Sequence, residues 1–186
     1  MTVLYPTRGI GEYTAYAFAK EGIKLVLSAR RKDKLEVVEK KIKEGGGEAI
    51  SVVCDVSNRS QVENLFFTAT KHYGTVDILF NNAGVFHLSK IKNLKLDEWD
   101  KMIDVNLKGA LYCIASVLPI LKQKKEGHIF NISSDADRKL FNGSSVYSST
   151  KAALTLFSEG LKKELIEEGF QDIKVRFLVL DNFETD

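Results

Sequence analysis

The chain has 186 residues, of which 44% are hydrophobic and 28% are charged, and its formal net charge is +2. This composition suits one soluble domain, so we expect a single domain over residues 1–186. The lysines are interleaved with acids and form no basic stripe, so we expect no nucleic-acid partner. The three histidines, His72, His87 and His128, lack metal-ligand spacing, so no metal is expected.

Cysteine use and hydropathy indicate the compartment. Cys54 and Cys113 lie in separate apolar runs, which favours buried thiols in a reducing environment over a disulfide. No apolar run approaches the roughly 20 residues that span a bilayer. The N-terminus has no signal-peptide pattern. We therefore expect a cytoplasmic protein without membrane association.

The first predicted elements surround a glycine pair. Residues 1–4 predict only a short piece of strand. Gly9 and Gly11 then flank Ile10 at the start of an apolar-periodic helix that Gly22 ends. Glycines at a helix N-terminus let a phosphate approach backbone N–H groups, but they also simply permit a tight turn. Both interpretations stay open from these residues alone.

The next strand, predicted over residues 24–28, is followed by Ala29, Arg30 and Arg31. In dinucleotide-binding units an acid near this point binds the ribose of NAD, and an arginine accommodates the 2′-phosphate of NADP. No acid occupies this strand end, and a guanidinium bonds a phosphate through two parallel contacts. The pair therefore favours NADP(H), with NAD(H) as the lesser alternative; a solvated helix start would also explain it.

The middle of the chain continues the alternation of helix and strand. We expect a helix over 33–43, a strand over 49–54 before Asp55, a helix from Ser57 or Ser60 to 73, and a strand over 76–80. Asn82 follows that strand, where an ordinary turn is the simplest interpretation. Asp97 is the expected N-cap of a helical tract over about 98–122.

The same helical tract contains Gly109 and Pro119, where we expect a bend or a break. Asn106 sits among apolar residues of the tract. A buried amide in such surroundings needs hydrogen-bond partners or a functional role.

The last predicted elements are a strand over 128–133, a helix over 144–168 and a strand over 174–180. Ser133 and Ser134 end the first of these strands, where sites of open α/β sheets lie. Tyr147 and Lys151 share a helix face. An ammonium favours the phenolate, and a serine hydroxyl can hold a carbonyl oxygen, so these residues predict a proton donor for a carbonyl that becomes an alcohol.

The spacing of Tyr147 and Lys151 also occurs at Tyr16 and Lys20, where no serine-bearing strand precedes it. We interpret that first pair as ordinary helix residues. Apolar strands alternate with helices throughout and no hairpin intervenes. The pattern predicts an α/β fold with a Rossmann-like, doubly wound parallel sheet in three layers, α/β/α.

In this order the motifs resemble those of the short-chain dehydrogenase/reductase family, whose members are NAD(P)-dependent oxidoreductases. The stretch from Asn131 is especially similar to bacterial broad-range reductases acting on 3-hydroxy acids and related alcohols. The resemblance implies that residues 1–186 form a single dinucleotide-binding domain. It also implies a small carbonyl or alcohol substrate and a homodimer or homotetramer formed through the long helices. The positions that it implies for cofactor contact are Gly9, Ile10, Gly11, Arg30, Arg31, Asp55, Asn82, Ala83, Gly84, Tyr147, Lys151 and Thr185.

The resemblance also implies four catalytic roles. Tyr147 is the acid/base and Ser134 holds the substrate carbonyl. Lys151 bonds the nicotinamide ribose and lowers the tyrosine pKa. Asn106 positions a water that relays protons.

Three features depart from the family pattern. In the family's Thr-Gly-x-x-x-Gly-x-Gly turn, Leu4 and Tyr5 replace the threonine and the first glycine. Tyrosine does not readily adopt positive φ, and we expect its ring to crowd the adenosine side of the pocket. The short first strand is central in this fold, so we expect a weaker sheet and cofactor cleft.

The third departure is at the C-terminal end, where Leu180 and Asp181 replace Pro-Gly and the last helix and strand of the family are missing. We expect strand 174–180 to be an exposed edge. The alternative function is therefore a catalytically silent or truncated homologue that binds a nucleotide or a partner.

The substrate is not specified by the sequence. Arg138 and Lys139 follow Ser134 and would attract a carboxylate, or they form a solvated loop. Phe141 is either a pocket wall or local packing.

Overall fold

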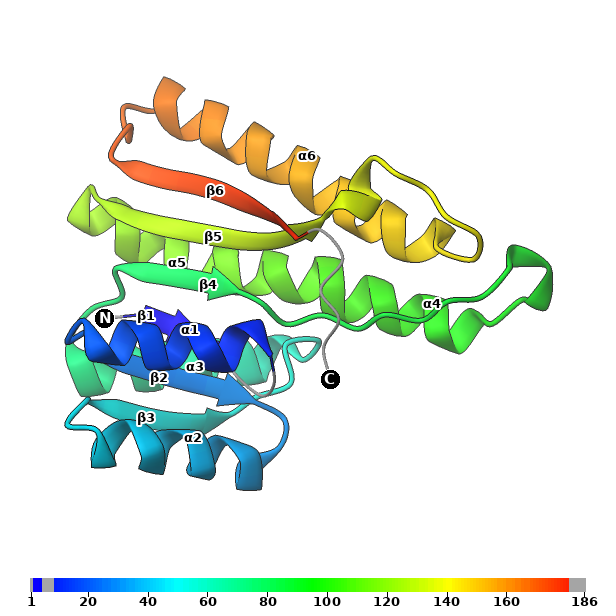
Figure 1. The fold of residues 1–186 in the computed structure, drawn as a ribbon. Helices are drawn as coiled ribbons and strands as arrows, with labels where there is room; N and C mark the ends of the chain where they lie inside the picture. Colours follow the sequence, from blue (N-terminus) through cyan, green and yellow to red (C-terminus); the bar gives the residue numbers. More distant parts are fainter. Residues whose placement is uncertain (1, 5–8, 181–186) are drawn as a thin grey trace.

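A parallel β-sheet lies at the centre of the fold, and the helices pack against it (Figure 1). The computed structural model describes residues 2–4 and 9–180. In this part of the chain six strands pair in the order β3-β2-β1-β4-β5-β6, and every pair is parallel. The predicted doubly wound sheet is confirmed. The strands are β1 Thr2–Leu4, β2 Leu25–Ala29, β3 Ala49–Val53, β4 Ile78–Asn81, β5 Gly127–Ser134 and β6 Ile173–Leu180.

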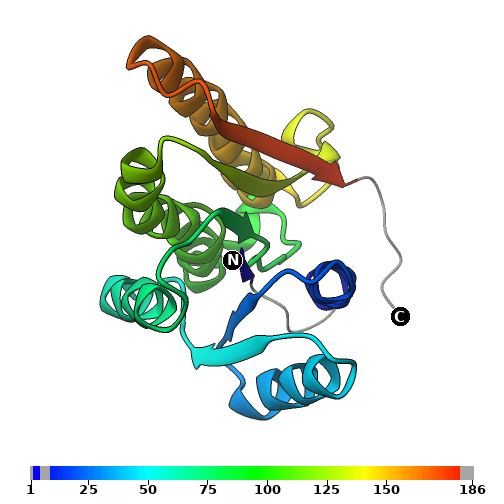
Figure 2. The ribbon, with the colours of Figure 1, turned by 90° about the vertical axis from the view of Figure 1, so that its left-hand side faces the viewer.

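Helices cover both faces of the sheet, as Figure 2 shows in the view along the layers. The side chains of a strand alternate between the two faces. Leu25 and Leu27 accordingly pack with α1 and α2, whereas Val26 packs with α3 and α5. The helices are α1 Ile10–Lys20, α2 Lys32–Glu44, α3 Arg59–Tyr73, α4 Leu96–Met102, α5 Gly109–Lys124 and α6 Ser145–Glu167.

The helical tract from α4 to α5 differs in detail from the prediction. Its N-cap is Lys95, which makes no side-chain cap hydrogen bond, and Asp97 lies in the first helical turn. The expected cap at Asp97 is therefore wrong, because the apolar Leu96 already belongs to the helix. A carboxylate in the first turn still interacts favourably with the helix dipole.

The expected interruption of this tract is a π-helical segment, η2 Ile103–Lys108, which ends just before Gly109. The predicted bend or break at Pro119 is not found, because α5 continues through that proline. Val117 and Leu121 are fully buried on either side of it, so core packing holds the helix despite the missing N–H donor.

Within the described residues, the tract Leu96–Lys124 is long and apolar enough to cross a membrane by length and composition alone. This corrects the expectation that no segment reaches that length. Ile114, Val117 and Leu121 of the tract are buried in the core that lies against the sheet. Packing against the sheet explains its apolar composition.

The first strand is as short as predicted and lies in the middle of the sheet. Its three residues pair with β2 on one side and with β4 on the other. At one end of the described sheet, β6 pairs with β5 and forms the expected edge. Tyr5, Asp181 and Thr185 lie outside the described residues, so the expectations for these positions stay predictions.

Candidate active site

The carboxyl end of β5 faces the first turns of α6, and this junction brings together three predicted site residues. Ser134 is the last residue of β5, while Tyr147 and Lys151 lie one turn apart in α6. The helix begins after the loop that follows β5, so its N-terminal turns return to the strand end. The predicted trio is therefore adjacent in space.

Tyr147 is a partly buried phenol whose hydroxyl is hydrogen-bonded to Ser134. Burial raises the pKa of Tyr147, the bond from Ser134 lowers it, and the carboxylate of Asp135 raises it. The net pKa lies above the ordinary value of 10.0. The phenol is therefore fully protonated at neutral pH and can act as a proton donor.

Lys151 lies behind the tyrosine and is only 5% exposed. Its Nζ donates to the backbone oxygen of Ile132 at 2.7 Å and lies 5.8 Å from the centre of the Tyr147 ring. Burial lowers the pKa of this ammonium to about 8. It remains mainly charged at neutral pH, and a nearby positive charge stabilises a phenolate.

Asn106 joins the loop after β4 to the helical layer. Its Oδ1 accepts from the Val85 backbone N–H at 2.7 Å, and its Nδ2 donates to the Val85 oxygen at 2.9 Å. Nδ2 also lies 3.2 Å from the hydroxyl of Thr150 on α6. The amide is 1% exposed and sits in the π-helical segment, a distortion that is frequent at functional sites. The structure thus shows Asn106 as a clamp on Val85.

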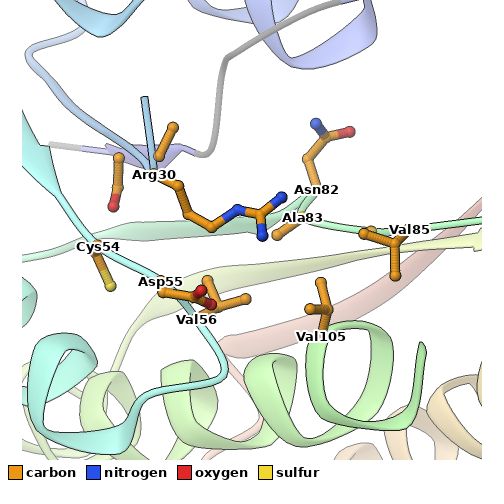
Figure 3. A pocket seen from close by; sticks show the side chains of 11 residues that line it. Arg30, Cys54, Asp55, Val56, Asn82, Ala83, Val85 and Val105 are labelled. Atoms are coloured by element: carbon orange, nitrogen blue, oxygen red, sulfur yellow. The ribbon is translucent and has the colours of Figure 1, made fainter. Parts of the chain in front are cut away.

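A cavity of about 230 Å³ opens at the carboxyl edge of the sheet (Figure 3). It contains five predicted cofactor positions: Arg30, Asp55, Asn82, Ala83 and Gly84. The side chain of Arg30 extends across it from the end of β2. The remaining lining residues are Ser28, Ala29, Cys54, Val56, Val85 and Val105.

The other predicted cofactor positions within the described residues do not line this cavity. Arg31 is exposed and forms the N-cap of α2. Gly9 has φ 57° at the N-cap of α1, a conformation that favours glycine, and Ile10 and Gly11 open that helix. The N-terminal end of α1 lies at the same sheet edge as the cavity (Figure 1). Thr185 lies outside the described residues.

Phe86 is a residue of this site that was not predicted from the sequence. Its ring lies edge-on to the ring of Tyr147, with a centroid separation of 4.6 Å. The residue follows the Asn82–Gly84 segment by two positions, and that closeness to a predicted motif was the only signal in the sequence.

The second Tyr-x-x-x-Lys pair is not part of this site. The hydroxyl of Tyr16 donates a hydrogen bond to Glu12 at 2.9 Å within α1. Burial, and to a smaller extent Glu12, raises the pKa of Tyr16 to about 12. Among residues 2–4 and 9–180, no group of three or more His, Cys, Asp or Glu residues is placed to hold a metal ion.

The chain matches the family described as short chain dehydrogenase over residues 3–186. It belongs to this family. The named relatives are oxidoreductases, and they give no support to the alternative of a catalytically silent homologue.

An uncharacterized oxidoreductase of Listeria innocua is 46% identical over 161 residues, which are 87% of this chain and 65% of that protein. One of Staphylococcus saprophyticus is 44% identical over 157 residues, or 84% of this chain and 63% of that protein. The chain thus spans slightly less than two thirds of these relatives.

Solved structures share the fold. A metagenomic short-chain oxidoreductase in complex with NADP is 32% identical and superimposes with a TM-score of 0.90, covering 96% of this chain and 80% of that chain. The Rossmann-like architecture of the chain is therefore that of short-chain dehydrogenase structures.

Proposed function

We propose that the protein is an NADP(H)-dependent oxidoreductase that moves a hydride between nicotinamide and a small carbonyl or alcohol substrate. The observation that carries this proposal is the convergence of Ser134, Tyr147 and Lys151 at the end of β5. The cavity with Arg30 and Asp55 supports the cofactor part. The activity of the full-length protein is part of the proposal, because the chain covers 63% and 65% of two relatives.

The chemistry of the cavity fits one part of a dinucleotide. Its volume of about 230 Å³ is below the range of roughly 300–1,000 Å³ that is typical of pockets for whole ligands. Arg30 offers a guanidinium that suits a phosphate. Asp55 offers a carboxylate that accepts from hydroxyl or amino groups, although Ser57 already donates to it at 2.7 Å. The NADP complex of the metagenomic relative supports the same choice of cofactor.

The proposed role of Tyr147 is to hold and move one proton. The bound nicotinamide cofactor supplies or accepts the hydride. In the reducing direction the phenol gives its proton to the carbonyl oxygen, and Ser134 holds that oxygen by a hydrogen bond. The raised pKa of Tyr147 keeps the phenol protonated, which suits reduction. In the oxidising direction the phenolate takes the proton of the alcohol.

Lys151 and Asn106 support this proton transfer in different ways. The buried ammonium of Lys151 stabilises the phenolate that forms when Tyr147 loses its proton. Asn106 fixes the backbone of Val85 beside the site. The water-positioning role that the family resemblance implies for Asn106 stays a prediction.

Cofactor choice is tested by fluorescence titration with NADPH and NADH. We expect NADPH to bind more tightly, and Arg30→Ala to weaken NADPH binding by about 10-fold to 150-fold, the equivalent of about 1.5–3 kcal/mol for hydrogen bonds to a charged group. NADH binding is expected to change little. Arg31→Ala is the matched control, because this neighbouring arginine does not line the cavity. Equal affinities for both cofactors would contradict the assignment.

The reaction is tested by following NADPH consumption with a panel of ketones and 3-keto acids. Tyr147→Phe removes the acidic proton and keeps the ring, so we expect a loss of about 10²–10⁴ in kcat. Tyr16→Phe is the control, because it changes the tyrosine of the same sequence spacing on α1. An unchanged rate in Tyr147→Phe would show that the assigned mechanism is wrong.

We also propose a cytoplasmic homodimer or homotetramer without nucleic-acid or membrane partners. The family resemblance supports the oligomer, and the modest net charge of +2 supports the absence of nucleic acid. Light scattering on the purified full-length protein measures the oligomeric state. A monomer at micromolar concentration would contradict this part.

A further inference from the structure

Two further aromatic side chains form a row with the ring of Tyr147. Phe86 lies edge-on to that ring at 4.6 Å between centroids, and Phe141 lies 6.2 Å from Phe86 on the same measure. Phe86 is 50% exposed and Phe141 is 46% exposed. Aromatic surface left open beside a reacting group is available to contact a ligand. We name Phe86 and Phe141 the aromatic wall.

The position of Phe86 is fixed by the clamp on the preceding residue. The Val85 backbone N–H donates to Asn106 Oδ1 at 2.7 Å, and the Val85 backbone oxygen accepts from Asn106 Nδ2 at 2.9 Å. Because Asn106 is buried in the helical layer, the loop that carries Phe86 is tied to a rigid element. A ring held in this way loses little conformational freedom when a ligand binds.

A second clamp fixes Phe141. The backbone N–H of Phe141 lies 3.2 Å from the Ser144 hydroxyl, and that hydroxyl lies 2.9 Å from the Phe141 oxygen. Ser144 is fully buried at the start of α6. Both rings are therefore carried by loops that a buried polar side chain holds in place.

The two loops are also joined to each other. The Ser89 backbone N–H donates to the Gly143 oxygen at 3.0 Å. Gly143 has φ +87°, and a Cβ there would lie 3.2 Å from the Ser89 nitrogen, so this close crossing depends on glycine. The aromatic wall is thus one preorganised surface made from two separate loops.

The charges around the wall do not favour an anionic substrate. Asp135 lies beside the reacting groups, with Oδ1 at 3.3 Å from the Ser134 hydroxyl. The nearby cations pair with acids of the same segment: Arg138 Nε lies 3.7 Å from Asp137, and Lys139 Nζ lies 3.9 Å from Asp135. The sequence-based suggestion that Arg138 and Lys139 attract a carboxylate gains no support. A carboxylate would face Asp135 and would lose water against the aromatic rings, which is costly.

We infer that the aromatic wall selects neutral carbonyl substrates that carry a flat, apolar substituent, such as aryl alkyl ketones, over keto acids. The wall lies on one side of Tyr147, where it contacts the substituent while the carbonyl oxygen meets Ser134 and Tyr147. The inference rests on the proposed function for the reaction itself, and it adds the substrate class and the residues that set it.

The experiment compares acetophenone, 2-butanone and acetoacetate in NADPH-dependent reduction. For Phe86→Ala we expect kcat/KM for acetophenone to fall by about 10-fold to 200-fold, the range for lost contacts in an apolar pocket. The value for 2-butanone is expected to fall less than about threefold, since its small substituent reaches less of the wall. Phe86→Leu keeps apolar surface and should restore part of the preference.

Phe67→Ala is the matched control, because Phe67 is 64% exposed and belongs to α3, which does not carry the aromatic wall. Its selectivity between the three substrates is expected to equal that of the unmodified protein. Urea unfolding of every variant separates a change in selectivity from a loss of folded protein.

A second measurement needs no turnover. Saturation-transfer NMR records acetophenone binding to the unmodified protein and to Phe86→Ala. One outcome is that no substrate is reduced, while acetophenone binds and Phe86→Ala abolishes the binding. That outcome supports the aromatic wall as a binding surface and contradicts the proposed reaction. If substrates are reduced but acetoacetate is preferred, or if Phe86→Ala leaves the selectivity unchanged, the inference about the aromatic wall is wrong and the proposed reaction is not affected. Absence of both turnover and acetophenone binding overturns both.

Discussion

The clamp of Asn106 on Val85 predicts a measurable loss of stability in Asn106→Leu. The substitution keeps a similar volume and removes the hydrogen bonds at 2.7, 2.9 and 3.2 Å. The N–H and the oxygen of Val85 then lack their partner, and a buried unpaired polar group costs about 1–3 kcal/mol. Val85 is partly buried, so the lower half of that range applies to each group. Thr150 keeps its bond to the Tyr147 oxygen at 2.7 Å and adds little.

The sum for the two backbone groups is about 2–4 kcal/mol of unfolding free energy. For a domain of this size that corresponds to a fall of about 4–16 °C in Tm. Urea unfolding, followed by the fluorescence of Trp99, measures the change as a lower midpoint at unchanged slope. Trp99 is the single tryptophan of the chain, so the signal has one source.

Thr150→Val is the control for this prediction, because it leaves both bonds between Asn106 and Val85 in place. We expect it to cost no more than about 1 kcal/mol. If Asn106→Leu were as stable as the unmodified protein within about 0.5 kcal/mol, the clamp would contribute nothing to the fold. The rigidity that we assign to the loop of Phe86 would then have no basis.

Two further predictions concern the site and its packing. Asp135→Asn removes a charge that raises the pKa of Tyr147, so the pKa falls, and alcohol oxidation, which needs the phenolate, should reach its plateau at lower pH; an unmoved pH profile of kcat/KM would show that Tyr147 does not feel this charge. Gly109→Ala places a methyl group 2.7 Å from the Val56 side chain, so we expect a net loss of about 1–3 kcal/mol in urea unfolding despite the better helix propensity of alanine; higher stability would mean that the wall of the cavity yields without cost.

The convergence of Ser134, Tyr147 and Lys151 could be predicted because it depends on local rules. A strand end and the first turns of the following helix lie at the same edge of a parallel sheet, and a spacing of four places two side chains on one helix face. The same rules place Arg30 and Asp55 at that edge. The order of strands and helices could also be predicted from local rules, because apolar residues recur with a different period in a helix than in a strand.

The contacts of Asn106 could not be predicted, because its partner Val85 lies 21 residues away. A polar side chain in an apolar tract indicated only that a partner was needed. No residue pattern predicts the π-helical segment around Asn106. Pro119 does predict a helix break, but packing in the core keeps α5 continuous there. Arg30 and Arg31 were equivalent in the sequence. The structure separates them, because Arg30 lines the cavity and Arg31 is the N-cap residue of α2.

The burial of Lys151 also makes the stability of the fold depend on pH. The pKa of this ammonium falls from 10.5 to about 8 in the folded chain, so between these values the unfolded chain binds more protons and the free energy of unfolding rises with pH. The difference between the two pKa values corresponds to about 3 kcal/mol of unfolding free energy. The fold is less stable by this amount below pH 8, and the loss disappears above about pH 10. At neutral pH the fold thus keeps a buried charge that opposes folding, beside the tyrosine that we propose as the acid/base.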